Sequence, residues 1–85
     1  MKPTQVRLFI KTYCGWCDEA IDWLEEHRIA FETLDVNTDP AAFKEMLALS
    51  HQTKAPVIEI DGKVLADFGA DELAEWMEKE GFDTR

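Results

Sequence analysis

The chain has 85 residues, a hydrophobic fraction of 46% and a formal net charge of −9 at pH 7. Such a length allows one small domain, residues 1–85, with enough apolar side chains for a core that needs no cross-links. An acidic surface disfavours nucleic acid and anionic membranes as partners. The sequence shows no apolar run of membrane-spanning length and no secretory signal pattern, so we expect a cytoplasmic protein, in which thiols stay reduced.

The first predicted elements are a strand and a helix. Residues 5–10 are nearly all apolar, which is typical of a strand buried on both faces. Residues 16–28 are predicted to be helical, because apolar side chains recur there at helical spacing. This buried stripe is formed by Cys17, Ala20, Ile21 and Leu24. His27 is interpreted as a residue at the helix end and not as a metal ligand.

Both cysteines, Cys14 and Cys17, lie where this strand turns into this helix, in the segment Lys11-Thr12-Tyr13-Cys14-Gly15-Trp16-Cys17. Backbone N–H groups at a helix start are unpaired, and the helix dipole is positive there. That environment favours a thiolate, the reactive form of cysteine, and Lys11 adds a positive charge. We therefore expect Cys14 to be the nucleophile. Cys17, one turn on and facing inward, would attack a mixed disulfide formed at Cys14.

Three structural alternatives apply to the same pair of cysteines. They could be inert core residues, half of a zinc site or a structural disulfide. Zinc normally takes four ligands, and His27 and His51 do not have the spacing of a zinc finger. A disulfide across so short a loop would stabilise little. Redox chemistry is thus the favoured interpretation.

The remaining chain alternates between strand and helix signals. Residues 31–36 alternate apolar and polar side chains, as in a strand with one wetter face. A helix is predicted over 41–49, with Asp39 as its N-cap, Pro40 in its first turn and three side chains turned inward. These three are Phe43, Met46 and Leu47.

The last third of the chain predicts a hairpin followed by a helix. Strands over 57–60 and 63–66 are joined by Asp61-Gly62, a strong hairpin signal. A final helix over 71–80 stops at Gly81. The whole order, βαβαββα, predicts an α/β fold with a four-stranded mixed sheet flanked by three helices on both faces. The cysteine pair would lie at the carboxyl end of the first strand, where open α/β sheets place their sites.

The chain resembles the glutaredoxins of the thioredoxin-fold superfamily essentially from end to end. The resemblance is carried by the segment 11–17 around the cysteines, by Lys54-Ala55-Pro56, by Asp61-Gly62 and by 68–73. It implies a monomeric thiol–disulfide oxidoreductase that reduces protein or glutathione mixed disulfides, with glutathione as co-substrate. It also implies a cis peptide bond at Pro56, beside the cysteines.

The resemblance implies a glutathione site as well. Lys11 and Gln52 would meet the glycine carboxylate of glutathione, and the Ala55 backbone would pair with its cysteinyl backbone. The γ-glutamyl end would be held at the start of the last helix, whose N–H groups can bind a carboxylate. The residues implied there are Gly69, Ala70 and Asp71, and the site is completed by Tyr13, Trp16 and Pro56.

Several positions depart from the family pattern, and two further functions follow from them. Gly15 and Trp16 replace the usual proline and tyrosine, and Phe68 replaces a glycine and is expected to narrow the groove. One alternative is therefore a redoxin reduced by thioredoxin reductase instead of glutathione. The other, suggested by Gly15, is a [2Fe–2S] carrier with Cys14 of two chains as ligands.

Trp16 is predicted to point largely outward, because Cys17 must face inward. Exposed aromatic side chains are common at recognition sites. Trp16 would then form a wall of the groove and contact glutathione or a protein partner. The alternative is that its ring folds over the loop and covers Cys17.

Overall fold

The computed structural model describes residues 1–84. Its helices and strands are, in chain order, β1 (Val6–Ile10), α1 (Gly15–Glu26), β2 (Glu32–Asp35), α2 (Pro40–Ser50), β3 (Val57–Ile60), β4 (Lys63–Ala66) and α3 (Ala70–Lys79).

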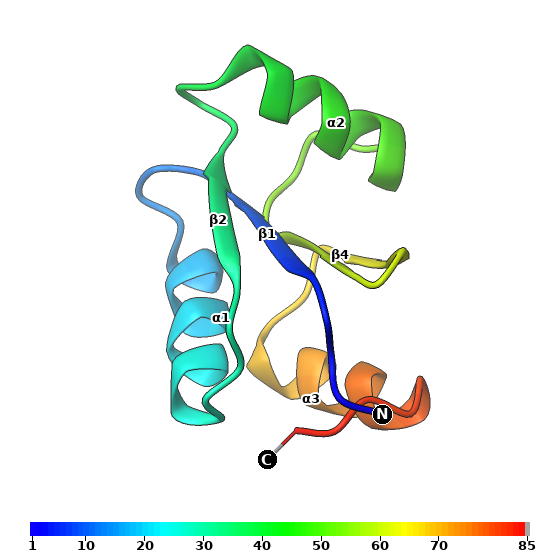
Figure 1. The fold of residues 1–85 in the computed structure, drawn as a ribbon. Helices are drawn as coiled ribbons and strands as arrows, with labels where there is room; N and C mark the ends of the chain where they lie inside the picture. Colours follow the sequence, from blue (N-terminus) through cyan, green and yellow to red (C-terminus); the bar gives the residue numbers. More distant parts are fainter. Residues whose placement is uncertain (85) are drawn as a thin grey trace.

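The four strands form one mixed sheet in the order β2-β1-β3-β4 (Figure 1). β1 pairs with β2 in parallel and with β3 in antiparallel, and β3 pairs with β4 in antiparallel. The predicted element order and fold class are therefore confirmed. The carboxyl end of β1, where the cysteine loop begins, meets the amino end of β3, because Phe9 pairs with Val57.

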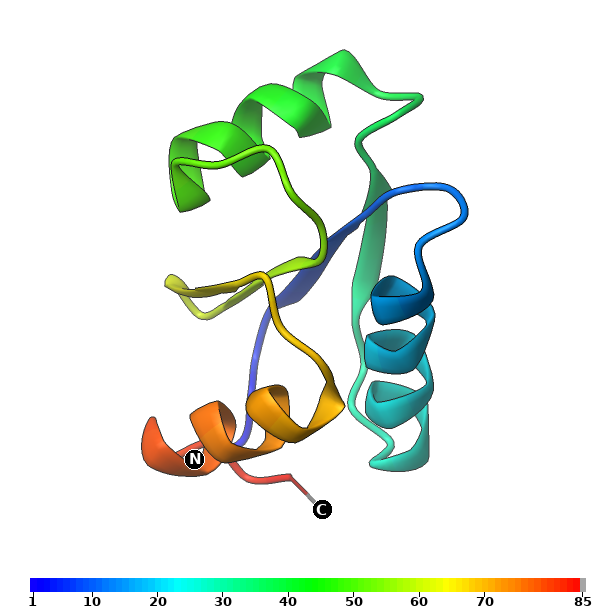
Figure 2. The ribbon, with the colours of Figure 1, turned by 180° about the vertical axis from the view of Figure 1, so that it is seen from behind.

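Helices cover both faces of the sheet. α2 lies on one side, and α1 and α3 lie together on the other (Figures 1 and 2). Side chains alternate along a strand, so Leu8 of β1 packs with the α1–α3 layer whereas Phe9 packs with the α2 layer. Both are fully buried, as predicted for a strand covered on two faces.

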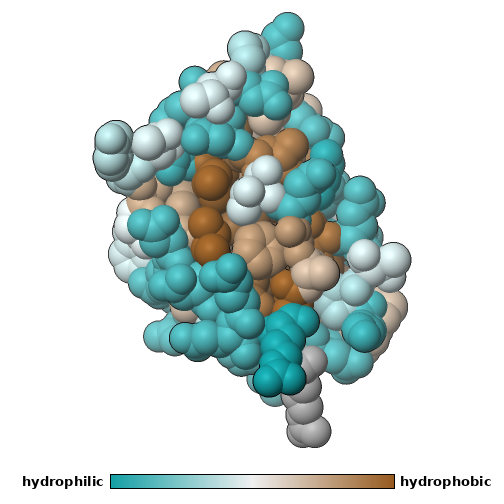
Figure 3. All heavy atoms as spheres, turned by 60° about the vertical axis from the view of Figure 1, so that its left-hand side comes forward, coloured by the Kyte–Doolittle hydropathy of each residue, from teal (hydrophilic) through white to brown (hydrophobic). Residues whose placement is uncertain are grey.

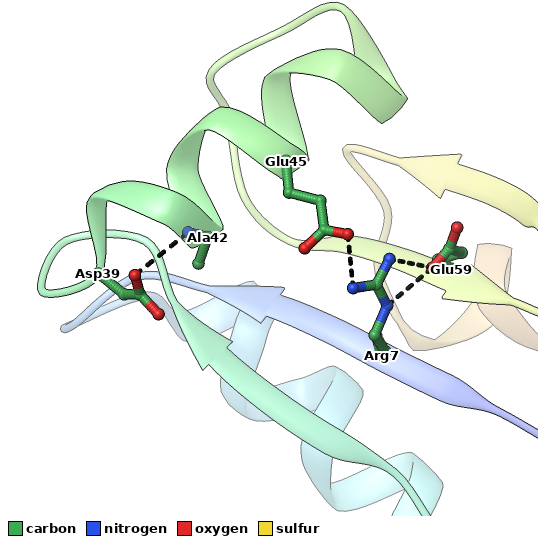
Figure 4. Close-up of polar contacts among 5 residues, drawn as sticks. All are labelled: Arg7, Asp39, Ala42, Glu45 and Glu59. Carbon is green, nitrogen blue, oxygen red and sulfur yellow. Dashed lines mark hydrogen bonds and ion pairs between the residues drawn. The ribbon is translucent and has the colours of Figure 1, made fainter.

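Arg7 lies in β1, on the α2 face of the sheet (Figure 4). Its guanidinium binds Glu59, its cross-strand partner on β3, and lies 2.6 Å from a carboxylate oxygen of Glu45 on α2. The hydrogen bonds to these two carboxylates raise the pKa of Arg7. A charge in an internal strand is tolerated here because it is paired on both sides.

The apolar face of α2 differs from the predicted one. Ala42 and Met46 are buried, one turn apart, and Phe43 and Leu49 pack partly against them. Leu47 was predicted to face inward but is 41% exposed, so that prediction was wrong. The physical reason is helix geometry, since Leu47 is rotated about 100° from Met46 and thus away from the sheet.

Helix ends follow the predicted signals, with shifts of one or two residues. Asp39 caps α2 by accepting hydrogen bonds from the N–H groups of Ala41 at 3.0 Å and Ala42 at 3.3 Å (the second is drawn in Figure 4). α1 ends at Glu26, two residues earlier than predicted, because Arg28 adopts a left-handed conformation with φ 56°. The His27 ring stacks on the Trp23 ring, with 4.0 Å between the ring centroids. His27 is the C-cap of α1 and is thus a helix-end residue, as expected.

Not all apolar side chains are covered. Figure 3 looks at the side of the molecule that carries α1 and β2, and hydrophobic side chains gather in the middle of that face, surrounded by hydrophilic ones. Ile10, Ile21, Ile29 and Phe31 are among the side chains that are only partly buried against the core. Within residues 1–84, each helix is too short or too polar to cross a membrane.

Candidate active site

The two cysteines occupy the junction between β1 and α1. Cys14 is the N-cap of α1 and its Sγ accepts a hydrogen bond from the N–H of Cys17 at 3.2 Å. Cys14 is partly exposed, whereas Cys17 is 1% exposed. The backbone turns sharply before the pair, where Tyr13 adopts a left-handed conformation with φ 59°. The Tyr13 side chain is fully exposed. Cys14 is thus the thiol that a disulfide in solvent can reach, and Cys17 lies behind it.

Burial raises the pKa of the Cys17 thiol to about 12. A hydrogen bond with the side chain of Cys14 acts in the same direction, and one with the backbone of Lys11 opposes it. Cys17 is therefore a neutral thiol at physiological pH. The two cysteines are chemically distinct, since one is accessible and the other is held protonated in the core.

The reduced protein should lose stability as the pH rises from about 9 to about 12. In this window the unfolded chain ionises at Cys17, because its thiol then has an ordinary pKa, while the folded chain keeps the proton. The free energy of unfolding therefore falls with pH above about 9 and is insensitive to this group below it. Urea unfolding at several alkaline pH values measures the slope. Cys17→Ala should flatten it, and an equal slope in both proteins would contradict the burial argument.

The Ala55–Pro56 peptide bond is cis, as predicted from the resemblance. Pro56 is fully buried and directly precedes β3, so it lies at the same end of the sheet as the cysteine loop. Lys11, Gln52 and Ala55 are each partly buried, and their role toward glutathione stays a prediction.

The amino end of α3 also reaches this region, through contacts with α1. The Gly69 N–H donates to Glu72 Oε1 at 2.8 Å, and the Ala70 N–H donates to Glu19 Oε1 of α1 at 2.9 Å. The Trp16 ring lies against Gly69, so closely that a Cβ at that position would stand 2.7 Å from a ring carbon. The start of α3 is thereby joined to the first turns of α1.

A small groove of about 190 Å³ lies at this contact. It is lined by Trp16, Asp67, Phe68, Gly69 and Glu72. The side chain of Phe68 is 3% exposed and packs in the core with α1 and α3. Phe68 also lines the groove, and its effect on the width of the groove toward glutathione stays a prediction. The exposed aromatic ring of the groove belongs to Trp16, which is 59% exposed.

Sequence reasoning missed the two carboxylates at the start of α3. Glu72 is three residues after the N-cap, where an acidic side chain commonly reaches back to the backbone, so a local signal existed. Glu19 had no such signal, since it precedes Ala70 by 51 residues. Asp71 is exposed on the first turn of α3.

Trp16→Ala should raise the KM for a disulfide substrate several-fold while lowering the melting temperature by only a few degrees. The ring is more exposed than buried, so its removal costs little core packing, but it removes the exposed aromatic wall of the groove. Steady-state kinetics and thermal unfolding test this together. A large loss of stability with an unchanged KM would show that the ring is packing against Gly69 and has no role in recognition.

The zinc interpretation finds no support in residues 1–84, which hold no group of three or more His, Cys, Asp or Glu side chains able to bind a metal ion. A [2Fe–2S] cluster would find one accessible ligand per chain, Cys14, because Cys17 is buried. Its other ligands would have to come from outside this chain.

An accessible cysteine at a helix N-cap and a buried cysteine one turn later, placed after the first strand of this mixed sheet, define a dithiol redox protein of the thioredoxin fold. The family model for glutaredoxin matches residues 6–65. The chain therefore belongs to the glutaredoxin family, whose members are thiol–disulfide oxidoreductases, and the predicted resemblance is confirmed.

Two relatives support the assignment. A glutaredoxin-like 8.6 kDa protein in a rubredoxin operon of Clostridium pasteurianum is 31% identical over 74 residues, which are 87% of this chain and 99% of that protein. The glutaredoxin-like protein NrdH of Lactococcus lactis subsp. lactis (strain IL1403) is 30% identical over 69 residues, 81% of this chain and 94% of its own length.

Solved structures agree with the fold. The thioredoxin-like protein BC3987 has a TM-score of 0.77 at 27% identity, with 84% of this chain and 97% of that chain covered. The NrdH-redoxin of Escherichia coli has a TM-score of 0.73 at 18% identity, with 85% and 93% covered. A buckwheat glutaredoxin–glutathione complex has a TM-score of 0.68 at 24% identity, with 89% and 69% covered.

Proposed function

We propose that this protein reduces protein disulfides through a dithiol cycle and is itself reduced by a protein dithiol, as supplied by a thioredoxin reductase. The observation that carries the dithiol cycle is the asymmetry of the pair, with Cys14 accessible at the N-cap and Cys17 buried one turn behind it. Catalytic roles are assigned to these two residues alone.

The cycle begins when the Cys14 thiolate attacks one sulfur of a substrate disulfide. A mixed disulfide forms at Cys14, and the other substrate sulfur leaves as a thiolate and takes up a proton. The Cys17 thiol then loses its proton and attacks Cys14 Sγ. This releases the second substrate thiol and leaves a Cys14–Cys17 disulfide, so two electrons have passed to the substrate.

Burial holds Cys17 in its protonated form at neutral pH, because its pKa is raised to about 12. The second step therefore needs a proton acceptor, and its rate should rise with pH. Regeneration reverses the exchange and needs a two-electron donor, for which a dithiol suffices.

The hydrogen bonds at the amino end of α3 favour a protein dithiol as this donor. Carboxylates of the chain itself already occupy the N–H groups of Gly69 and Ala70. Two relatives at 30% identity are named glutaredoxin-like protein NrdH, and this similarity supports a donor other than glutathione. The partly buried Lys11, Gln52 and Ala55 and the exposed Asp71 support glutathione as the second candidate donor.

A donor comparison tests the proposal. Reduction of a small disulfide is followed by NADPH oxidation, once with thioredoxin reductase and once with glutathione plus glutathione reductase. We expect the first rate to exceed the second by about tenfold, which corresponds to about 1.4 kcal/mol. A faster rate with glutathione would overturn the donor assignment. Absence of disulfide reduction even with dithiothreitol would overturn the oxidoreductase assignment.

A further inference from the structure

We infer that Glu19 is a specificity-determining residue, whose carboxylate occupies the Ala70 N–H and so keeps small carboxylate-bearing thiols such as glutathione out of the groove. The inference rests on the proposed function and assigns the selection of its electron donor to a particular contact. The observation behind it is a hydrogen bond between α1 and α3, from the Ala70 N–H to Glu19 Oε1 at 2.9 Å.

The N–H groups that begin a helix are a ready binding site for a carboxylate, because they have no partner within the helix and the dipole is positive there. Gly69 is the N-cap of α3, and Ala70 is its first residue. Glu72 accepts the N–H of the first, and Glu19 accepts the N–H of the second. An external carboxylate that binds the N–H group of Gly69 or Ala70 would have to displace one of these internal ones.

The two internal carboxylates differ in how firmly they belong to the helix start. Glu72 is on α3 itself, three residues from Gly69, and its contact is local. Glu19 reaches across from α1 and is an exposed residue. Glu19 is therefore the contact that can be removed while the cap of α3 by Glu72 remains.

The charges around this contact act in the same direction. Of the side chains that line the neighbouring groove, Asp67 and Glu72 are acidic, and the described lining contains no Lys or Arg. Glu19 adds a further negative charge at Ala70, the residue that follows the lining residue Gly69. An anionic ligand would therefore find the Ala70 N–H already occupied and would be repelled by the negative charges around it.

A protein dithiol is not subject to the same exclusion. Its thiol needs access to Cys14, which is partly exposed, and its surface can rest on Tyr13 and Trp16, which are exposed beside it. None of these contacts requires a free N–H at α3. Glu19 thus selects between the two classes of donor by occupying a carboxylate site, and it leaves access to the Cys14 thiol open.

Binding of S-methylglutathione, a probe that cannot react, tests the inference by calorimetry. Glu19→Ala should bind it about fivefold more tightly than the wild type, since an exposed charged contact is worth about 1 kcal/mol. Glu19→Gln keeps an oxygen for the Ala70 N–H and should gain less than Glu19→Ala. Glu25→Ala, which removes an equal charge from an exposed position elsewhere on α1, should gain nothing.

Turnover gives the second readout. The ratio of glutathione-supported to dithiothreitol-supported disulfide reduction should rise about fivefold in Glu19→Ala, as binding does. An unchanged affinity and ratio in Glu19→Ala would overturn the inference. Equal gains in Glu19→Gln or Glu25→Ala would also overturn it, because charge alone would then explain the effect.

These results are separable from a failure of the proposed function. If dithiothreitol supports no disulfide reduction, the oxidoreductase proposal fails, while the affinity for S-methylglutathione still decides what Glu19 excludes. Thermal unfolding of each variant confirms that the α1–α3 layer is intact before the affinities are compared.

Discussion

Cys14→Ser should abolish disulfide reduction, with a loss in kcat/KM of about three orders of magnitude or more. The reason is that a serine hydroxyl does not form the anion at neutral pH that attacks a disulfide sulfur, and the remaining cysteine is buried. Cys17 is 1% exposed, and burial raises its pKa to about 12, so it cannot replace Cys14. Turnover of a small disulfide with dithiothreitol as donor gives the measurement.

The matched variant, Cys17→Ser, separates the two roles. Attack by Cys14 remains intact, whereas resolution is lost, so this variant should accumulate a mixed disulfide with its substrate. Mass spectrometry without reducing agent detects the adduct. Accumulation of the adduct in Cys14→Ser instead of Cys17→Ser would reverse the assignment of nucleophile and resolving cysteine.

Met46→Ala should lower the free energy of unfolding by about 2–5 kcal/mol. Met46 is fully buried between α2 and the sheet, where it packs in the smaller core cluster with Phe9 and Val57. The loss is large against the total stability of about 4–13 kcal/mol expected for a chain of this length. Urea unfolding followed by far-ultraviolet circular dichroism measures it.

The neighbouring substitution Leu47→Ala is the control. Leu47 is 41% exposed, and alanine is a strong helix former, so the cost should stay below about 1 kcal/mol. Equal losses in the two variants would mean that α2 is rotated about its axis relative to the sheet. The comparison therefore tests directly the point on which the sequence interpretation of this helix was wrong.

The sequence by itself determined the class of fold and the position of the cysteine pair. Local signals were sufficient, because each depends on neighbours in the chain. An apolar run ends at Ile10, four residues before Cys14, and a helical stripe begins at Cys17. Asp39 caps α2, and Asp61-Gly62 closes the β3–β4 hairpin. The inward direction of Cys17 also followed from the spacing of that stripe alone. The element order and the family resemblance were confirmed on this basis.

Other features were decided only by the tertiary structure. The inward face of α2 depends on how the helix is rotated against the sheet, and spacing alone does not set that rotation, since Ala42 and Met46 are one turn apart just as Phe43 and Leu47 are. The partners of Arg7 come from β3 and α2, at 52 and 38 residues' distance in the chain. Glu19 reaches Ala70 across 51 residues. Contacts between residues so far apart leave no periodic trace in a single sequence, because each side chain, taken alone, fits equally well on a solvated surface.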